Sequence, residues 1–229
     1  MANETAQPRI AIVVGMKSEA RLAGAGGLAV VGGGSAARVE AGLARLHEAR
    51  PLHGVLSFGV AGGLAPDLRP GDLVAATAVF SASGVFSCHA AWAEFLSRAA
   101  PDARPGALLG VDEPILTPEN KRRLHEETGA IAVDMESHGA ARFAQANDLP
   151  FAVFRAISDP QERAVPSAAL AGFRPDGSTD VGAVLVALAR NPGQTAALIG
   201  AAFDAREAFG ALLGGRRRLG GRFGFDQIA

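Results

Sequence analysis

The chain has 229 residues, of which 48% are hydrophobic, and its 22 basic and 23 acidic side chains give a formal net charge of −1. This balance excludes a general electrostatic attraction to nucleic acid or to an acidic membrane surface, and the composition is that of a globular protein. The single cysteine, Cys88, excludes an intramolecular disulfide and a zinc site built on cysteines, and it favours a reducing cytoplasm.

The sequence carries no targeting signal and no membrane-spanning segment that we can identify. Residues 1–16 have no basic stretch followed by a long apolar one, so we expect no signal peptide. No apolar stretch reaches the roughly 18 to 20 uninterrupted residues of a membrane-spanning helix. We therefore expect a single cytoplasmic domain over residues 1–229, with a flexible basic tail over about 215–229.

The first half of the chain alternates apolar runs with helical patterns. Residues 9–15 ("RIAIVVG") and 28–34 ("LAVVGGG") predict strands, and the apolar spacing of the following "SAARVEAGLARLHEA" predicts a helix. Between His53 and Phe80 the pattern predicts a strand, a glycine loop at "FGVAGG", a turn at "RPGD" and a second strand. The run "AAWAEFLSRAA" then predicts a further helix.

The second half continues this alternation. A helix is predicted to begin at Pro118, with Thr117 as its N-cap. The strand "AIAVDM" leads into a helix, "MESHGAARFAQAN", that we expect to begin at Met135, and "FAVFRAISD" predicts another strand. A proline-rich loop then extends to about Asp180, and two helices that are broken near "NPGQ" follow.

This alternation predicts an α/β fold with three layers, in which helices cover both faces of a central parallel or mixed sheet. In such sheets ligands bind outside the carboxyl ends of the strands. The predicted strand ends carry "GMKSE", "GGGSAAR", "FGVAGG", "DMES" and "SDP". We therefore expect a functional site where these segments meet.

Carboxylates at the strand ends indicate chemistry. A buried carboxylate without a partner costs several kcal/mol or takes up a proton, so Asp134, Glu136 and Asp159 are unexpected beside apolar runs unless they have a function. Asp134 has a second interpretation, as a cap of the helix that follows it. No G-x-S-x-G pattern and no metal-ligand spacing such as H-E-x-x-H is present. We expect neither a metal nor another cofactor.

The glycine-rich segments allow two interpretations. The segment "VVGGGSAAR" follows a strand and opens a helix, so its free N–H groups around Gly33 could hold an anion. Alternatively, its glycines and those of "FGVAGG" serve only the backbone angles of tight turns. Neither standard nucleotide-binding motif is matched. The segments must therefore be interpreted from the residues that accompany them.

Four motifs, in this order along the chain, resemble the nucleoside phosphorylase and nucleosidase superfamily, in particular its methylthioadenosine/adenosylhomocysteine nucleosidases. They are "IVVGMKSEA", "SFGVAGGLAPDLRPGDLV", "AVDMESHGAA" and "VFRAISD". A closer resemblance, to the hopanoid-associated phosphorylases or adenosylhopane nucleosidases, rests on "GMKSEAR", "SFGVAGGL", "VDMESHGAARFA" and "FRPDGSTDVGAVL". The resemblance implies a phosphorylase–hydrolase-like fold and release of adenine from a 5′-hopanyl adenosine.

The resemblance also assigns catalytic roles. It makes Asp159 the acid that protonates the purine at N7, a contribution worth roughly 10²- to 10⁴-fold in rate. It makes Glu19 the group that activates water, whereas the phosphorylases place a phosphate-binding arginine in that loop. A carboxylate repels phosphate but takes a proton from water. Arg21 lies close by in the sequence and, with Gly33, could instead support an anion site.

The resemblance further implies a substrate-binding set. Glu136 binds the ribose hydroxyls and Met135 packs under the sugar, while Ser158 helps to hold the base. The set of base and loop contacts is completed by Val60, Ala61, Gly62 and Ile115. Val60 replaces the serine that the family uses near phosphate. Ile115, or alternatively Leu116, replaces its stacking phenylalanine.

These assignments leave several functions open. The first is an N-glycoside hydrolase, and the alternatives are a phosphate-dependent phosphorylase on the same substrate, a methylthioadenosine/adenosylhomocysteine nucleosidase, and a catalytically silent nucleoside-binding protein. The expected partners are a small adenosine-type molecule that carries a lipid, no nucleic acid, and further copies of the chain. The tail "RRRLGGRFGF" could contact lipid headgroups at the inner membrane, or it is a disordered basic end.

Overall fold

The computed structural model describes residues 8–228, in which eight strands form one mixed sheet. The strands are β1 (Ile10–Val14), β2 (Leu28–Val31), β3 (Gly54–Gly63), β4 (Leu73–Ser81), β5 (Gly84–Ser87), β6 (Arg104–Gly110), β7 (Ala132–Asp134) and β8 (Phe151–Asp159). Their order is β2-β1-β3-β7-β6-β4-β5, and β8 pairs with both β3 and β4. The ring of pairs from β3 through β7, β6, β4 and β8 back to β3 closes the middle of the sheet.

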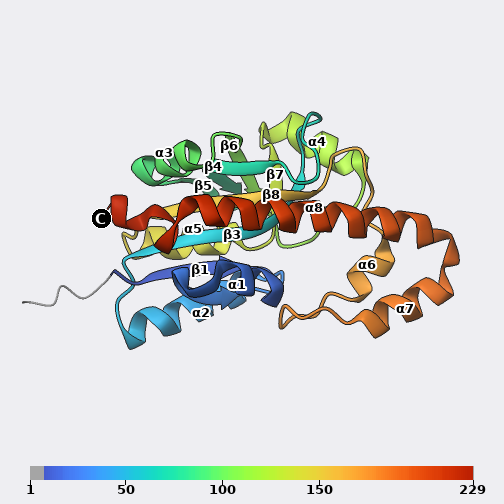
Figure 1. Ribbon diagram of the computed structural model, residues 1–229, viewed down its shortest axis with the longest axis horizontal. Helices are drawn as coiled ribbons and strands as arrows, with labels where there is room; N and C mark the ends of the chain where they lie inside the picture. The colour runs from blue at the N-terminus through green and yellow to red at the C-terminus, as the bar shows by residue number, and fades with distance from the viewer. Residues whose placement is uncertain (1–7, 229) are drawn as a thin grey trace, which may run out of the picture.

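Helices cover both faces of this sheet. They are α1 (Lys17–Ala23), α2 (Ala36–Ala49), α3 (Ala90–Ala99), α4 (Pro118–Thr128), α5 (Ser137–Ala146), α6 (Ser167–Ala171), α7 (Val181–Arg190) and α8 (Thr195–Leu219), with short 3₁₀ turns at Gly24–Gly26, Pro192–Gln194 and Gly221–Gln227. Figure 1 shows α8 running along the sheet and α6 and α7 standing apart at one end. The arrangement confirms the predicted α/β fold class with a central mixed sheet.

The core has two parts, one on each face of the sheet. Because side chains alternate along a strand, β3 sends Val55 to the face covered by α2 and α5 and Leu56 to the face covered by α3 and α8. Both side chains are completely buried. A strand covered on both faces reads as a continuous apolar run rather than an alternating one, which is the pattern of "RIAIVVG" and "FAVFRAISD" in the sequence.

Several predicted boundaries differ from the structure. The segment "FGVAGG" is the end of β3 and not a loop, since Gly62 and Gly63 pair with β7. The helix expected from Met135 begins at Ser137, because the backbone at Glu136 is not yet helical. The expected loop before Asp180 contains the short helix α6, and strands β5 and β6 were not predicted. The two C-terminal helices, interrupted near residues 192–194, are confirmed.

The C-terminal residues pack on the body of the protein, whereas their composition predicts a flexible basic tail. Phe223 and Phe225 are buried, and the Trp92 indole Nε1–H donates a 2.9 Å hydrogen bond to the Phe223 carbonyl. The Arg216 guanidinium lies 4.3 Å from the centre of the Phe223 ring. These aromatic rings are therefore not available to a lipid surface. Among the helices within residues 8–228, none combines the length and apolar character needed to cross a membrane.

Candidate active site

A cavity of about 330 Å³ opens at the carboxyl ends of β1, β3, β7 and β8. This volume is typical of small-molecule sites. One part of its wall is polar and includes Glu19, Asp134, Glu136, Ser158 and Asp159. Another part is apolar and is formed by Val111, Pro114, Ile115, Leu116, Val165, Ala169, Leu170 and Phe173.

The residues to which the sequence assigns catalytic, ribose-binding and base-binding roles all line this cavity. They are Glu19, Val60, Ala61, Gly62, Ile115, Met135, Glu136, Ser158 and Asp159. They come from the ends of β3 and β8, from α1, from the segment after β7 and from the loop before α4, which are far apart in the chain. The tertiary structure brings them together around one cavity, and their individual chemical roles remain proposals.

The two residues suggested for an anion site do not lie on the cavity wall. Arg21 is an exposed residue of α1. The N–H of Gly33 already donates to the Gly15 carbonyl at 3.1 Å, and the N–H of Gly34 donates to Glu136 Oε1 at 2.8 Å. The N–H groups of these two glycines therefore have partners within the protein and are not free donors for an anion.

Glu19 is a buried carboxyl group at the start of α1. Its Oε2 accepts hydrogen bonds from the N–H groups of Gly15 and Met16 at 2.8 and 2.7 Å, and its Oε1 accepts from the N–H of Val60 at 2.7 Å. A carboxylate oxygen can accept two such bonds, so Oε1 has capacity for one more partner. Because Glu19 borders the cavity, that partner can be a water molecule beside a bound ligand.

The environment of Glu19 has opposing effects on its protonation. Burial raises the pKa of Glu19 above its ordinary value, while the nearby Arg155 guanidinium and the three N–H donors act in the opposite direction. A carboxyl group with a raised pKa is a stronger base when it is ionised, as removal of a proton from water requires. The glycine at position 59 makes this packing possible, since a Cβ there would lie 2.5 Å from Glu19 Oε1.

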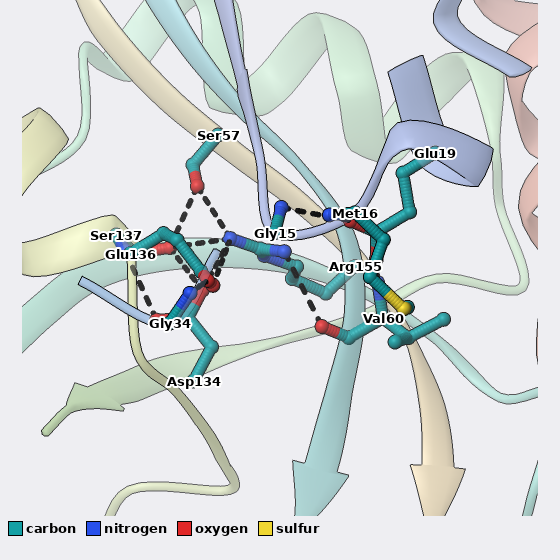
Figure 2. A network of polar contacts seen from close by, with 10 residues as sticks. All are labelled: Gly15, Met16, Glu19, Gly34, Ser57, Val60, Asp134, Glu136, Ser137 and Arg155. Carbon is teal, nitrogen blue, oxygen red and sulfur yellow. Dashed lines mark hydrogen bonds and ion pairs between the residues drawn. The ribbon is translucent and has the colours of Figure 1, made fainter. Parts of the chain in front are cut away.

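Asp134 and Glu136 are two further carboxyl groups of the site and, like Glu19, they lie near the Arg155 guanidinium (Figure 2). Asp134 Oδ2 lies 2.5 Å from an Arg155 guanidinium nitrogen, and Glu136 Oε2 lies 4.0 Å from the same nitrogen. Asp134 Oδ1 also accepts from the N–H of Ser137 at 3.0 Å. Asp134 thus supports the start of α5, as one interpretation of the sequence held, and it also neutralises a buried guanidinium.

Arg155 connects the three carboxyl groups of Glu19, Asp134 and Glu136, and it is not among the site residues predicted from the sequence. It is completely buried in β8, and its guanidinium donates to Ser57 Oγ at 2.7 Å and to the Val60 carbonyl at 3.3 Å. A lone arginine inside the apolar run "FAVFRAISD" was the available signal, because a buried guanidinium requires anionic partners. In the described part of this network one guanidinium accompanies three carboxyl groups, those of Glu19, Asp134 and Glu136.

This excess of carboxyl groups affects the protonation of Glu136. Burial is the largest effect and raises the pKa of Glu136 to about 7; the Arg155 guanidinium opposes it, and the charges of Asp134 and Glu19 add to it. The folded protein therefore binds a proton at Glu136 that the unfolded chain releases near pH 4.5. The associated stability is fully present below that pH and is lost as the pH rises towards 7.

We expect the substitution Glu136→Gln to stabilise the protein in a pH-dependent way. Glutamine can keep the hydrogen bond from Gly34 and cannot ionise, so the variant avoids a cost of roughly 3 kcal/mol that the wild type has at pH 8. Thermal unfolding should show a Tm several degrees above that of the wild type at pH 8 and a much smaller difference at pH 5. An equal difference at both pH values, relative to the exposed control Glu48→Gln, would contradict this account.

Asp159 and Ser158 lie at the end of β8, on the wall near Ala61 and Gly62. The Ser158 hydroxyl donates to Asp159 Oδ1 at 2.7 Å. The other carboxyl oxygen, Oδ2, accepts from the ammonium group of Lys121 at 2.6 Å. Lys121 is not predicted from the sequence to belong to a site, since it stands in the charged run "NKRRLHEE", which is typical of a solvent-exposed helix face.

A family model described as the phosphorylase superfamily matches residues 10–190. The chain belongs to the phosphorylase superfamily. The superfamily predicted from the four motifs is thereby confirmed. A search of curated protein sequences found no match to this member of the superfamily.

Solved structures share the fold of this phosphorylase-superfamily protein. A Helicobacter pylori 5′-methylthioadenosine/S-adenosylhomocysteine nucleosidase complexed with a pyrrolidin-3-ol compound is 20% identical, with a TM-score of 0.62 over 68% of this chain and 86% of that chain. Futalosine hydrolase of H. pylori strain 26695 is 21% identical, with a TM-score of 0.60 over 68% and 86%. An aspartate-to-asparagine mutant of the H. pylori nucleosidase, with 5′-methylthioadenosine in its active site, is 17% identical, with a TM-score of 0.65 over 93% and 99%.

Proposed function

We propose that this protein is a purine nucleosidase that hydrolyses the N-glycosidic bond of a 5′-substituted adenosine, with adenosylhopane as its substrate in hopanoid synthesis. The observation that carries the proposal is the arrangement of the cavity. Glu19, Glu136 and Asp159 form part of its polar lining, and apolar side chains that include Leu170 and Phe173 form the rest. The first supplies the chemistry and the second the room for an apolar 5′ group.

In the proposed reaction Asp159 delivers a proton to N7 of the purine, so that the base leaves as a neutral molecule when the C1′–N9 bond breaks. Glu136 accepts hydrogen bonds from the ribose hydroxyls and stabilises the positive charge that develops on the sugar. Met135, which also lines the cavity, packs under the sugar. A water molecule adds to C1′ and loses its proton to Glu19.

Hydrolysis is favoured over phosphorolysis by the charges of the site. A phosphate ion would meet Glu19 and Glu136 at the polar wall, and Arg21 lies on the surface instead of at the cavity. The N–H groups of Gly33 and Gly34 are also occupied. The structural neighbours are a nucleosidase, seen in two structures, and a futalosine hydrolase, which agrees with a hydrolytic reaction.

The size of the 5′ group is the finer part of the proposal. A hopane skeleton is larger than the space that an adenosine leaves in a cavity of about 330 Å³. It would therefore extend past the apolar side chains of Leu116, Leu170 and Phe173. Each methylene buried there contributes about 0.8 kcal/mol. These contacts would therefore favour adenosylhopane over 5′-methylthioadenosine, the substrate expected if the protein is instead a methylthioadenosine/adenosylhomocysteine nucleosidase.

The proposal includes a cytoplasmic homo-oligomer that contacts the inner membrane at its periphery. The residues of α7 and α8 that expose large apolar side chains are consistent with such contacts, since extended apolar patches on a protein surface mark interaction sites. They are Val181, Leu185, Val186, Ile199 and Phe203. The packed C-terminal segment, to which the sequence analysis assigned membrane contact, has buried its aromatic rings and is a poorer candidate.

The first test is adenine release from adenosylhopane in detergent, with and without inorganic phosphate, in water enriched in oxygen-18. We expect release without phosphate, and ribosylhopane that carries the label at C1′. A phosphoribosyl product formed only with phosphate would make the protein a phosphorylase. Comparable kcat/KM values for 5′-methylthioadenosine and adenosylhopane would contradict the proposal that adenosylhopane is the specific substrate. No adenine release from either nucleoside would favour a catalytically silent nucleoside-binding protein.

A further inference from the structure

Lys121 is a completely buried lysine on α4. Its neighbours on the helix, Arg122 and Arg123, are exposed. Placing an ammonium group out of water costs several kcal/mol unless it is paired and fully hydrogen-bonded. The burial of this one cation, in a charged helix, therefore points to a specific task.

The ammonium group of Lys121 meets the end of β8 and the loop that follows it. It donates to Asp159 Oδ2 at 2.6 Å and to the carbonyl groups of Pro160 and Arg163, both at 2.9 Å. These three partners match the three N–H groups of an ammonium ion. The same loop continues to Val165, whose N–H donates to the Leu116 carbonyl at 2.9 Å and which lines the cavity.

The pair lies between the protein interior and the cavity. The Asp159 side chain is 26% exposed, whereas that of Lys121 is 0% exposed. Because the Ser158 hydroxyl donates to Oδ1 and Lys121 donates to Oδ2, both carboxyl oxygens of Asp159 accept hydrogen bonds from the protein. An Asp159 carboxylate in this position has no proton of its own to pass to a purine. Apart from the Ser158 hydroxyl, the group that donates a hydrogen bond directly to this carboxylate is the Lys121 ammonium, which therefore holds the nearest available proton.

We propose that Lys121 is a positioning residue that aims Asp159 at the base and supplies the proton that Asp159 transfers. This inference rests on the proposed function. The Nζ–H bond of Lys121 breaks as an O–H bond forms on Asp159, and that O–H bond breaks as the N7–H bond of the purine forms. The electron pair of the C1′–N9 bond goes to the purine. Water bonds to C1′ and gives a proton to Glu19. Glu19 later releases that proton to solvent, and a hydronium ion from solvent returns a proton to Lys121 through the partly exposed Asp159 carboxylate.

The test uses Lys121→Gln, which keeps N–H donors near the carbonyl groups, and Lys121→Met, which has a similar length and no polar group. The matched control is Arg122→Gln on the exposed face of α4. The probes are 5′-methylthioadenosine and adenosylhopane, with kcat and KM for adenine release measured from pH 5 to pH 8. Circular dichroism during heating establishes that each variant is folded.

At pH 8 we expect both Lys121 variants to lose roughly 100-fold in kcat, with KM within about threefold of the wild type and Arg122→Gln unchanged. At pH 5 the deficit in kcat should narrow to less than about tenfold, because the higher concentration of hydronium ions lets solvent supply the proton that Lys121 supplies in the wild type. Other charged groups near the pair or in the cavity are the same residues in the wild type and the variants, so that the ratio of rates removes their contribution to the pH dependence. They are Glu19, Asp134, Glu136, Glu162, Arg163 and Asp204.

The alternatives give different results. A folded Lys121→Gln variant with wild-type kcat at pH 8 would overturn the inference, and so would a loss of the same size at every pH, which indicates a structural role alone. If the wild type releases no adenine from either nucleoside, the proposed function fails and this inference fails with it. If the wild type is active and the Lys121 variants have the same kcat as the wild type, only the inference about Lys121 fails and the proposed function stands.

Discussion

Adenine release is expected to fall by roughly 10²- to 10⁴-fold in the variant Asp159→Asn, because the amide cannot deliver a proton to the purine. The side chain keeps its size and its place between Ser158 and Lys121, so KM should change little. The buried ammonium of Lys121 loses its anionic partner and keeps the carbonyl groups of Pro160 and Arg163. A hydrogen bond to a charged group is worth about 2 kcal/mol, so Tm should drop by several degrees.

The control for this experiment is Asp148→Asn. Asp148 is exposed and has a left-handed backbone conformation, with φ of 52°, which asparagine also accepts. We expect it to leave kcat and Tm close to those of the wild type. Turnover by Asp159→Asn at the wild-type rate would show that Asp159 is not the acid and that a different group protonates the purine.

The variant Glu19→Gln is expected to lose roughly 10²- to 10⁴-fold in phosphate-independent adenine release, since it cannot take a proton from water. It should also be less stable. Both oxygens of Glu19 accept backbone N–H groups, so the amide NH₂ of glutamine must face at least one donor and leave it unpaired, at a cost of about 1–3 kcal/mol. The measurements are kcat without phosphate and the Tm, with the exposed Glu48→Gln as control.

The same variant separates hydrolysis from phosphorolysis. Removing the Glu19 charge lowers the repulsion that a phosphate ion would meet in the cavity. If the wild type is a phosphorylase, phosphate-dependent release by Glu19→Gln should be maintained or increased. If it is a hydrolase, adding phosphate should not restore the rate. A Glu19→Gln variant that hydrolyses at the wild-type rate would contradict the proposed role of Glu19.

Much of the fold can be predicted from local patterns, namely apolar runs for buried strands and capping residues for helix starts. Strands β1 and β8 are apolar runs because both faces of the sheet are covered, and α4 begins where Thr117 Oγ1 accepts the N–H of Asn120 at 3.3 Å. Where the prediction was wrong, a long-range contact was the cause. The glycines of "FGVAGG" suggested a loop, yet they continue β3, and at Gly59 the missing side chain leaves room for Glu19 and Arg155.

The α/β class, the superfamily and the carboxyl groups at the strand ends can be predicted from the sequence, because strand and helix periodicity, caps and short motifs are local properties. Which charges are paired depends on the folded chain. Lys121 is separated from Asp159 by 38 positions and Glu19 is 41 from Val60, and no local pattern links either pair. Whether a carboxyl group is buried, ionised or bonded depends on groups brought together by the closed sheet, since desolvation and charge act through space and not along the chain.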